Sequence, residues 1–243
     1  MTQFLASAAH AEEAHLLARM EVDIVDLKDP AQGALGAWPL TSVRALVGSL
    51  AAPRVSATVG DLPMDPEVIR PAVDAMAETG VNFVKIGFFE GGDWSAVRSA
   101  LAPLAKAGAP MVAVLFADQR PDLGQISAFR DVGFLGVMLD TADKRRGRLV
   151  DHLPLSSLST FIDEARAAHL LTGLAGSLRL EDLRLLSPLS PDYLGFRGAL
   201  CQGGRTGALC PLAIAAIKRG LTQNGVKAYG PLPSTGAVPC VTP

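Results

Sequence analysis

Charged side chains stand at the ends of apolar segments that are typical of buried strands. The stretch Val22–Asp29 reads VDIVDLKD, and alternation along a strand places Asp26 and Lys28 on one face. A second stretch, VNFVKIGF, places Lys85 on the corresponding face of another strand. Because burying charge is costly, we expect these side chains to line a pocket that uses amines.

A third strand end supplies another carboxylate. Asp140 ends the run FLGVMLD, and Lys144 follows four residues later, where it could turn back over the pocket. A lysine near another cation in a low-dielectric site has a lowered pKa, which frees its amine to attack a carbonyl. The carboxylates could then move protons during imine formation and carbon–carbon chemistry. Salt bridges that close the mouth of the fold are the alternative, and Arg145, Arg146 and Arg148 are predicted to be solvated.

Two glycine-rich segments, TGLAGSL and RGALCQGGRTG, are typical of phosphate-binding loops. Glycine lets backbone N–H groups approach an anion, and the helices expected from Leu180 and Thr206 would add a favourable dipole. The arginines of the second segment could donate charged hydrogen bonds. Tight turns without a ligand are the alternative. The candidate phosphate-binding residues are Gly173, Gly176, Ser177, Arg197, Gly198, Gly203, Gly204 and Arg205.

Apolar, β-branched runs alternate with helical segments along the chain, which predicts repeated βα units. Strands are expected at Phe4–Ser7, Asp23–Lys28, Arg54–Val59, Asn82–Gly87, Met111–Phe116, Phe134–Asp140, His169–Leu174 and Tyr193–Arg197. Helices are expected at Ala11–Arg19, Asp65–Glu78, Trp94–Ala107, Ile126–Val132, Leu158–Ala168, Leu180–Leu186 and Thr206–Asn224. Eight such units predict a single-domain α/β fold, the (β/α)8 TIM barrel, with its active site at the carboxyl ends of the strands. An open doubly wound sheet is less favoured, because no glycine-rich turn follows an early strand.

Composition limits the possible partners. The 243 residues are 49% hydrophobic and carry a formal net charge of −2, which argues against nucleic acid. The sequence contains neither an apolar run long enough to span a membrane nor a secretory signal pattern. Three cysteines without metal-binding spacing favour a reducing, cytoplasmic compartment. We expect the barrel over residues 1–228, a flexible proline-rich tail over 229–243, and a homo-oligomer.

Five stretches in this order resemble one family: DIVDLKDPAQGALGA, FVKIGF, GVMLDTADK, GLAGSL and DYLGFRGALCQGGRTG. They are similar to the (5-formylfuran-3-yl)methyl phosphate synthases of methanofuran biosynthesis, from the first strand to about Lys218. The resemblance implies a (β/α)8 barrel that uses no metal or organic cofactor. It also implies a lyase that joins two molecules of glyceraldehyde 3-phosphate into a furan phosphate, with loss of phosphate and water. By motif, the essential residues would be Asp26, Lys28, Lys85, Asp140 and Lys144, with the imine on Lys28.

Two other functions stay open from the sequence. A different class I aldolase could form a lysine imine with another sugar phosphate, and only the synthase would yield a furan chromophore. A barrel that binds a triose phosphate without catalysis would release no phosphate from it.

Overall fold

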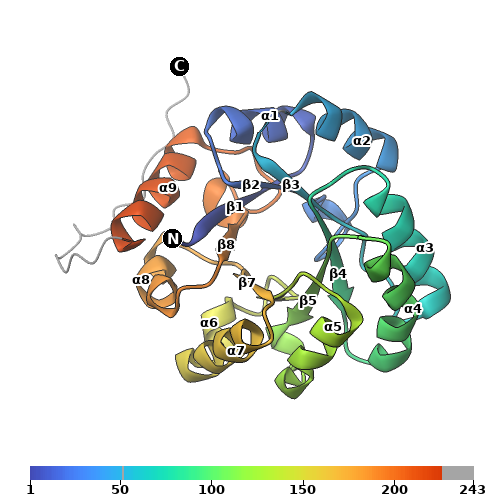
Figure 1. Ribbon diagram of the computed structural model, residues 1–243. Helices are drawn as coiled ribbons and strands as arrows, with labels where there is room; N and C mark the ends of the chain where they lie inside the picture. Colours follow the sequence, from blue (N-terminus) through green and yellow to red (C-terminus); the bar gives the residue numbers. More distant parts are fainter. Residues whose placement is uncertain (51, 226–243) are drawn as a thin grey trace.

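The computed structural model describes residues 1–50 and 52–225, which contain a closed barrel of eight parallel strands in the order β1 to β8. The strands form a central ring with helices around it (Figure 1). This architecture confirms the predicted (β/α)8 barrel. The strands are β1 Gln3–Ala8, β2 Ile24–Leu27, β3 Arg54–Thr58, β4 Phe83–Phe88, β5 Met111–Phe116, β6 Gly136–Asp140, β7 Leu171–Leu174 and β8 Tyr193–Phe196.

Helices connect consecutive strands, and their starts follow local sequence signals. Helix α3 begins with Pro66 after Asp65, whose carboxylate accepts from the Glu67 N–H at 2.9 Å and so satisfies a free helix donor. The helices are α1 Ala11–Arg19, α2 Leu40–Ser49, α3 Pro66–Ala77, α4 Trp94–Lys106, α5 Ile126–Val132, α6 Leu149–His152, α7 Leu155–Ala167, α8 Leu183–Leu186 and α9 Pro211–Gly225. Short 3-10 turns include η1 Pro30–Gln32, η4 Leu180–Asp182 and η6 Gly198–Leu200.

Alternation along each strand divides the barrel into two hydrophobic regions. One set of side chains packs outward beneath the helices, for example Val25 and Leu27 of β2. The other set fills the barrel, for example Ile24 of β2 and Phe83 of β4. Asp26 and Lys85 continue this inward set, so the predicted face is correct, and the polar residues stand above an apolar floor.

Gly173 belongs to this interior and not to a phosphate loop, which corrects its predicted role. It lies within β7, and a Cβ atom there would fall 2.2 Å from the Tyr193 ring. Glycine is therefore required so that the tyrosine of the neighbouring strand can pack.

Several other boundaries differ from the predictions. Helices α2 and α6 are additions to the predicted set, because α2 follows Pro39 without a side-chain cap and α6 is a single turn. The last helix begins at Pro211 and not at Thr206, since the segment before it forms η6 and a loop. The predicted tail, 229–243, lies outside the described residues. None of the helices in the described residues has the length and apolar character needed to cross a bilayer.

Candidate active site

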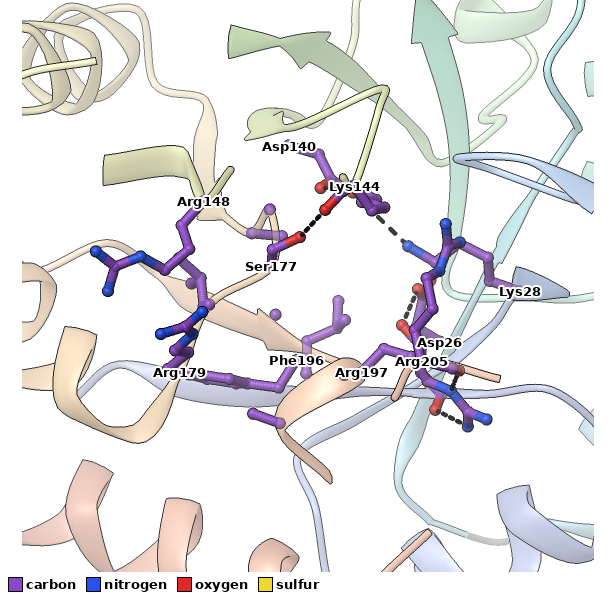
Figure 2. Close-up of a pocket in the computed structure, with 18 of the residues that line it drawn as sticks. Asp26, Lys28, Asp140, Lys144, Arg148, Ser177, Arg179, Phe196, Arg197 and Arg205 are labelled. Carbon is purple, nitrogen blue, oxygen red and sulfur yellow. Dashed lines mark hydrogen bonds and ion pairs between the residues drawn. The ribbon is translucent and has the colours of Figure 1, made fainter. Parts of the chain in front are cut away.

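A cavity of about 460 Å³ opens at the carboxyl ends of the strands, where the barrel fold places active sites. Charged side chains line it, with eight lysines and arginines against three aspartates, although the whole chain has a formal net charge of −2. Figure 2 shows Lys28, Asp26 and Arg205 at one end of this pocket, and Arg148 and Arg179 at the other. The excess of cations suits a small ligand that carries several negative charges.

The deepest polar contact in the pocket joins β2 to β4. The Nζ of Lys85 lies 2.7 Å from Asp26 Oδ1, and both side chains are buried. The hydroxyls of Ser7 and Ser56 donate to the two oxygens of Asp26, at 2.9 and 2.7 Å. Every carboxylate oxygen therefore has a partner, which is the condition for keeping a charge inside a barrel.

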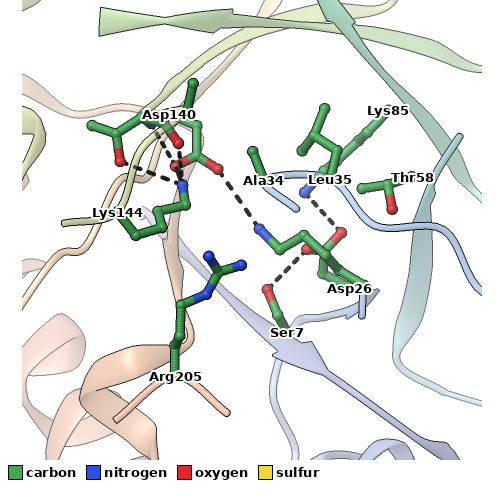
Figure 3. Close-up of polar contacts among 12 residues, drawn as sticks. Ser7, Asp26, Ala34, Leu35, Thr58, Lys85, Asp140, Lys144 and Arg205 are labelled. Carbon is green, nitrogen blue, oxygen red and sulfur yellow. Dashed lines mark hydrogen bonds and ion pairs between the residues drawn. The ribbon is translucent and has the colours of Figure 1, made fainter. Parts of the chain in front are cut away.

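A second group lies nearer the mouth of the barrel. Lys28, directly after β2, places its Nζ 3.7 Å from Oδ2 of Asp140, the last residue of β6. Lys144 donates to the other oxygen of Asp140 and to the carbonyl of Thr141. Figure 3 shows Asp140 facing Lys144 on one side of the site and Asp26 facing Lys85 on the other. The structure thus brings together all five residues predicted to be catalytic.

The proximity of these charges changes their pKa values. Burial lowers the pKa of Lys144 to about 8, because attraction to Asp140 only partly offsets burial and the repulsion from Lys28. Burial also lowers the pKa of Lys85, against the attraction of Asp26. Burial would raise the pKa of Asp140, but Lys144 and Lys28 outweigh it and hold that pKa well below its usual range. The site therefore contains fixed carboxylates beside an amine that can exchange a proton near neutral pH.

Arg205 spans the mouth of the pocket from the loop after β8. Its Nη2 donates to the Gly33 carbonyl at 2.8 Å, in the loop after β2. Asp61 holds that loop by accepting from the N–H groups of Ala34 and Leu35, each at 2.7 Å. Arg205 is thereby fixed on the same side of the pocket as Lys28 (Figure 2).

Two loop segments at the cavity contain backbone N–H groups without a backbone acceptor in the described part of the chain. Ser177 and Leu178 follow β7, whereas Gly198 and Ala199 begin η6 directly after β8, and all four residues line the pocket. Their N–H groups donate no backbone hydrogen bond in the described part of the chain. Free donors at the start of a helical turn are suited to an anion.

Gly203 and Gly204 lie outside the two cavity-lining segments, which corrects their predicted role in phosphate binding. Both are exposed and absent from the cavity lining, and their φ angles of 70° and 101° serve the turn of the loop. Gly176 does line the pocket, with a φ of 107° that ordinary residues rarely adopt.

Arg197 lines the pocket, but its guanidinium is used inside the protein. It pairs with buried Glu13 of α1, and it donates to the carbonyls of Ser7, Arg205 and Gly207 at 3.1, 2.8 and 3.1 Å. Its donors are thus engaged by one carboxylate and three carbonyls. We therefore correct its predicted role: Arg197 positions the loop that carries Arg205, because all five of its N–H donors are used within the protein.

The sequence analysis missed part of the cavity wall. Arg148, predicted to be solvated, lines the pocket together with Asp151 and Arg179, whereas Arg145 borders the pocket and is solvated as predicted, with its side chain 91% exposed. A run of basic residues is usually a solvated loop, so the sequence held no signal for this placement. In the ranges 1–50 and 52–225, no group of His, Cys, Asp and Glu side chains is arranged to hold a metal ion.

Comparison with known proteins identifies the family. Residues 4–218 match the family model described as 4-HFC-P synthase. The (5-formylfuran-3-yl)methyl phosphate synthase of Methanocaldococcus jannaschii is 32% identical over 218 residues, covering 82% of this chain and 90% of that protein. The synthase of Methanobrevibacter smithii is 31% identical over 230 residues, covering 88% of this chain and 96% of that protein.

Among solved structures, 3-hexulose-6-phosphate synthase from Salmonella typhimurium superposes with a TM-score of 0.67 at 15% identity, over 92% of this chain and all of that chain. That likeness is one of fold. The family model matches residues 4–218, a range that includes the strand ends that carry the lysines and aspartates. The chain therefore belongs to the 4-HFC-P synthase family of enzymes.

Proposed function

We propose that this protein condenses two molecules of glyceraldehyde 3-phosphate into 4-(hydroxymethyl)-2-furancarboxaldehyde phosphate, with loss of phosphate and water, in methanofuran-type cofactor biosynthesis. The observation that carries the proposal is the amine of Lys28, which lies in a cationic pocket 3.7 Å from a carboxylate oxygen of Asp140. The names of the curated relatives support the same reaction.

Lys28 is the residue proposed to form the imine. Its amine attacks the aldehyde carbon of one triose phosphate, and loss of water from the adduct gives the imine. Removal of a proton from the adjacent carbon then makes that carbon a nucleophile toward the aldehyde of the second triose phosphate. Phosphate is then lost, a hydroxyl group closes the ring by attacking the imine carbon, the Lys28 amine leaves that carbon, and dehydration completes the furan.

Asp140 and Lys144 are proposed to transfer protons at these steps. Both lie beside Lys28, and the pKa of Lys144, about 8, lets its amine exchange a proton near neutral pH. Asp26 and Lys85 form the polar base of the site beneath Lys28 and add a second cation against the bound substrate.

One substrate phosphate is proposed to lie between the turn at Ser177–Leu178 and the start of η6 at Gly198–Ala199. The residues there line the cavity, their N–H groups have no backbone acceptor in the described part of the chain, and Arg205 adds a charge-assisted donor. An anion so held would keep the rest of the triose within the pocket.

The test is to incubate the purified protein with glyceraldehyde 3-phosphate and follow the furan by ultraviolet absorption, mass and phosphate release. Borohydride added during turnover should trap an adduct that peptide mapping places on Lys28. The Lys28→Arg variant should make no furan, because its guanidinium stays protonated. The exposed Lys106→Arg substitution is the matched control. An adduct on Lys85 or Lys144 would overturn the assignment, and no furan from the wild type would overturn the function.

A further inference from the structure

Arg148 and Arg179 of the cavity wall are not used by the proposed chemistry. Arg148 and Arg179 line the end of the pocket away from Lys28 and Arg205, with Ser177 and Phe196 between the two ends (Figure 2). Cations gathered on one wall of a small cavity repel each other unless a negative group lies between or behind them.

Arg148 is held by two carboxylates. Its Nη1 donates to Asp182 at 2.9 Å, and its Nε and Nη2 donate to Asp151 at 3.1 and 2.9 Å. Asp182 is only 1% exposed, so this buried carboxylate holds the Arg148 guanidinium in place from inside the protein. Since each terminal nitrogen carries two protons, Arg148 keeps donors that these carboxylates do not use.

Arg179 is anchored by its backbone while its side chain is left available. Its N–H donates to the other oxygen of Asp182 at 2.8 Å, so both arginines are fixed on one buried carboxylate. The side chain is 64% exposed, and its ion pair with Glu181 is a long one, 3.7 Å from Nη1 to Oε1 and beyond hydrogen-bond reach. Figure 2 shows Arg179 and Arg148 at the same end of the pocket.

We infer that Arg148 and Arg179 form a second anion site, which takes the phosphate monoester of the second triose phosphate. The geometry carries the anion site, and the identity of the ligand rests on the proposed function. Two guanidinium groups match the oxygens of a phosphate monoester, because each can donate two parallel hydrogen bonds. With two separate anion sites, the phosphates of the two substrates would be bound at different places, and their reactive carbons would both be directed toward Lys28.

Calorimetric titration of the full chain with inorganic phosphate tests the site without catalysis. We expect the wild type to bind two phosphate ions and the Arg179→Ala variant to bind one at the same concentrations. Arg184→Ala is the matched control, since Arg184 is exposed on the next helix and does not line the cavity. Arg148→Lys, which keeps a cation beside Asp182, should weaken the same site. One ion bound to the wild type, or two to Arg179→Ala, would overturn the inference.

The furan assay separates this inference from the proposed function. In Arg179→Ala the glyceraldehyde 3-phosphate concentration at half-maximal furan formation should rise about tenfold or more, the loss expected for one charged contact. In the same variant, the amount of triose that borohydride traps on Lys28 should depend on the glyceraldehyde 3-phosphate concentration as it does in the wild type. If the wild type makes no furan, the proposed function is wrong. The number of phosphate ions bound in the titration then still tests the second anion site. If furan forms equally well in Arg179→Ala, the second site fails alone.

Discussion

Lys144 is the amine of the pocket whose charge is expected to change near neutral pH. Burial lowers its pKa to about 8, the repulsion of Lys28 lowers it further, and the attraction of Asp140 opposes both. In a lysine-labelled NMR titration we therefore expect a midpoint near 8 that disappears in Lys144→Arg. Asp140→Asn should move the midpoint down, because it removes the attraction, and Lys28→Met should move it up, because it removes the repulsion. A titration midpoint that is unchanged in both variants would contradict this account.

Asp26 and Lys85 depend on each other inside the barrel. Removing one partner of a buried ion pair leaves an uncompensated charge, which costs about 3–5 kcal/mol. Asp26→Leu should therefore lower the free energy of unfolding by that order in urea denaturation at pH 7. The double variant with Lys85→Met should recover most of the loss, since no buried amine is then left unpaired. Equal stability of the single and double variants would show that the pair is not the source of the loss.

At the scale of elements, the Glu13–Arg197 ion pair connects helix α1 to the loop after β8. Arg197 also donates to carbonyls at Ser7, Arg205 and Gly207, so it joins three segments around the mouth of the barrel. We expect Glu13→Ala to destabilise the protein by about 3–5 kcal/mol, because it leaves a buried guanidinium without its carboxylate.

The same change should also loosen the loop that carries Arg205. Hydrogen exchange of residues 198–207 should speed up in Glu13→Ala more than exchange in β4 or β5. Glu12→Ala is the matched control, since Glu12 is 85% exposed and pairs with exposed His10. Surface ion pairs of that kind contribute about 0–1 kcal/mol. Unchanged exchange of the loop would refute the role given to Arg197.

At the scale of the whole molecule, charge is unevenly distributed. The chain has a formal net charge of −2, yet lysines and arginines outnumber aspartates in the cavity wall. Salt should weaken phosphate binding, because the Debye length falls from about 30 Å at 0.01 M to about 8 Å at 0.15 M. We expect the dissociation constant of inorganic phosphate to rise severalfold over this range of sodium chloride. Equimolar sucrose, which screens no charge, is the control, and a constant affinity in salt would contradict the prediction.

Some expectations for the whole molecule remain predictions. The homo-oligomer can be tested by light scattering of the purified chain, and cytoplasmic location by fractionation of cells that express it. The absence of nucleic-acid partners can be tested by a gel-shift assay. The division into a barrel over 1–228 and a tail over 229–243 concerns residues beyond the described chain and can be tested by truncation.

The pattern of residues along the chain is sufficient to predict the fold and most of the catalytic group. Alternation along a strand fixes which side chains share a face, and repeated βα units fix that the strands run parallel. Parallel strands bring their carboxyl ends to one side of the barrel. For these reasons the sequence predicts that Asp26, Lys28, Lys85 and Asp140 share one pocket, and in the folded chain all four line the same cavity.

The choice of partner for each charged side chain depends on the tertiary structure. Asp26 and Lys28 are neighbours on β2, but Asp26 pairs with Lys85 of β4, and Lys28 faces Asp140 of β6. Likewise, Arg197 pairs with Glu13, whereas Arg148 and Arg179 are held at the cavity wall by hydrogen bonds to Asp182. These contacts join residues that are distant in sequence. They depend on the register and closure of the barrel and on loop conformations, which local propensity does not fix.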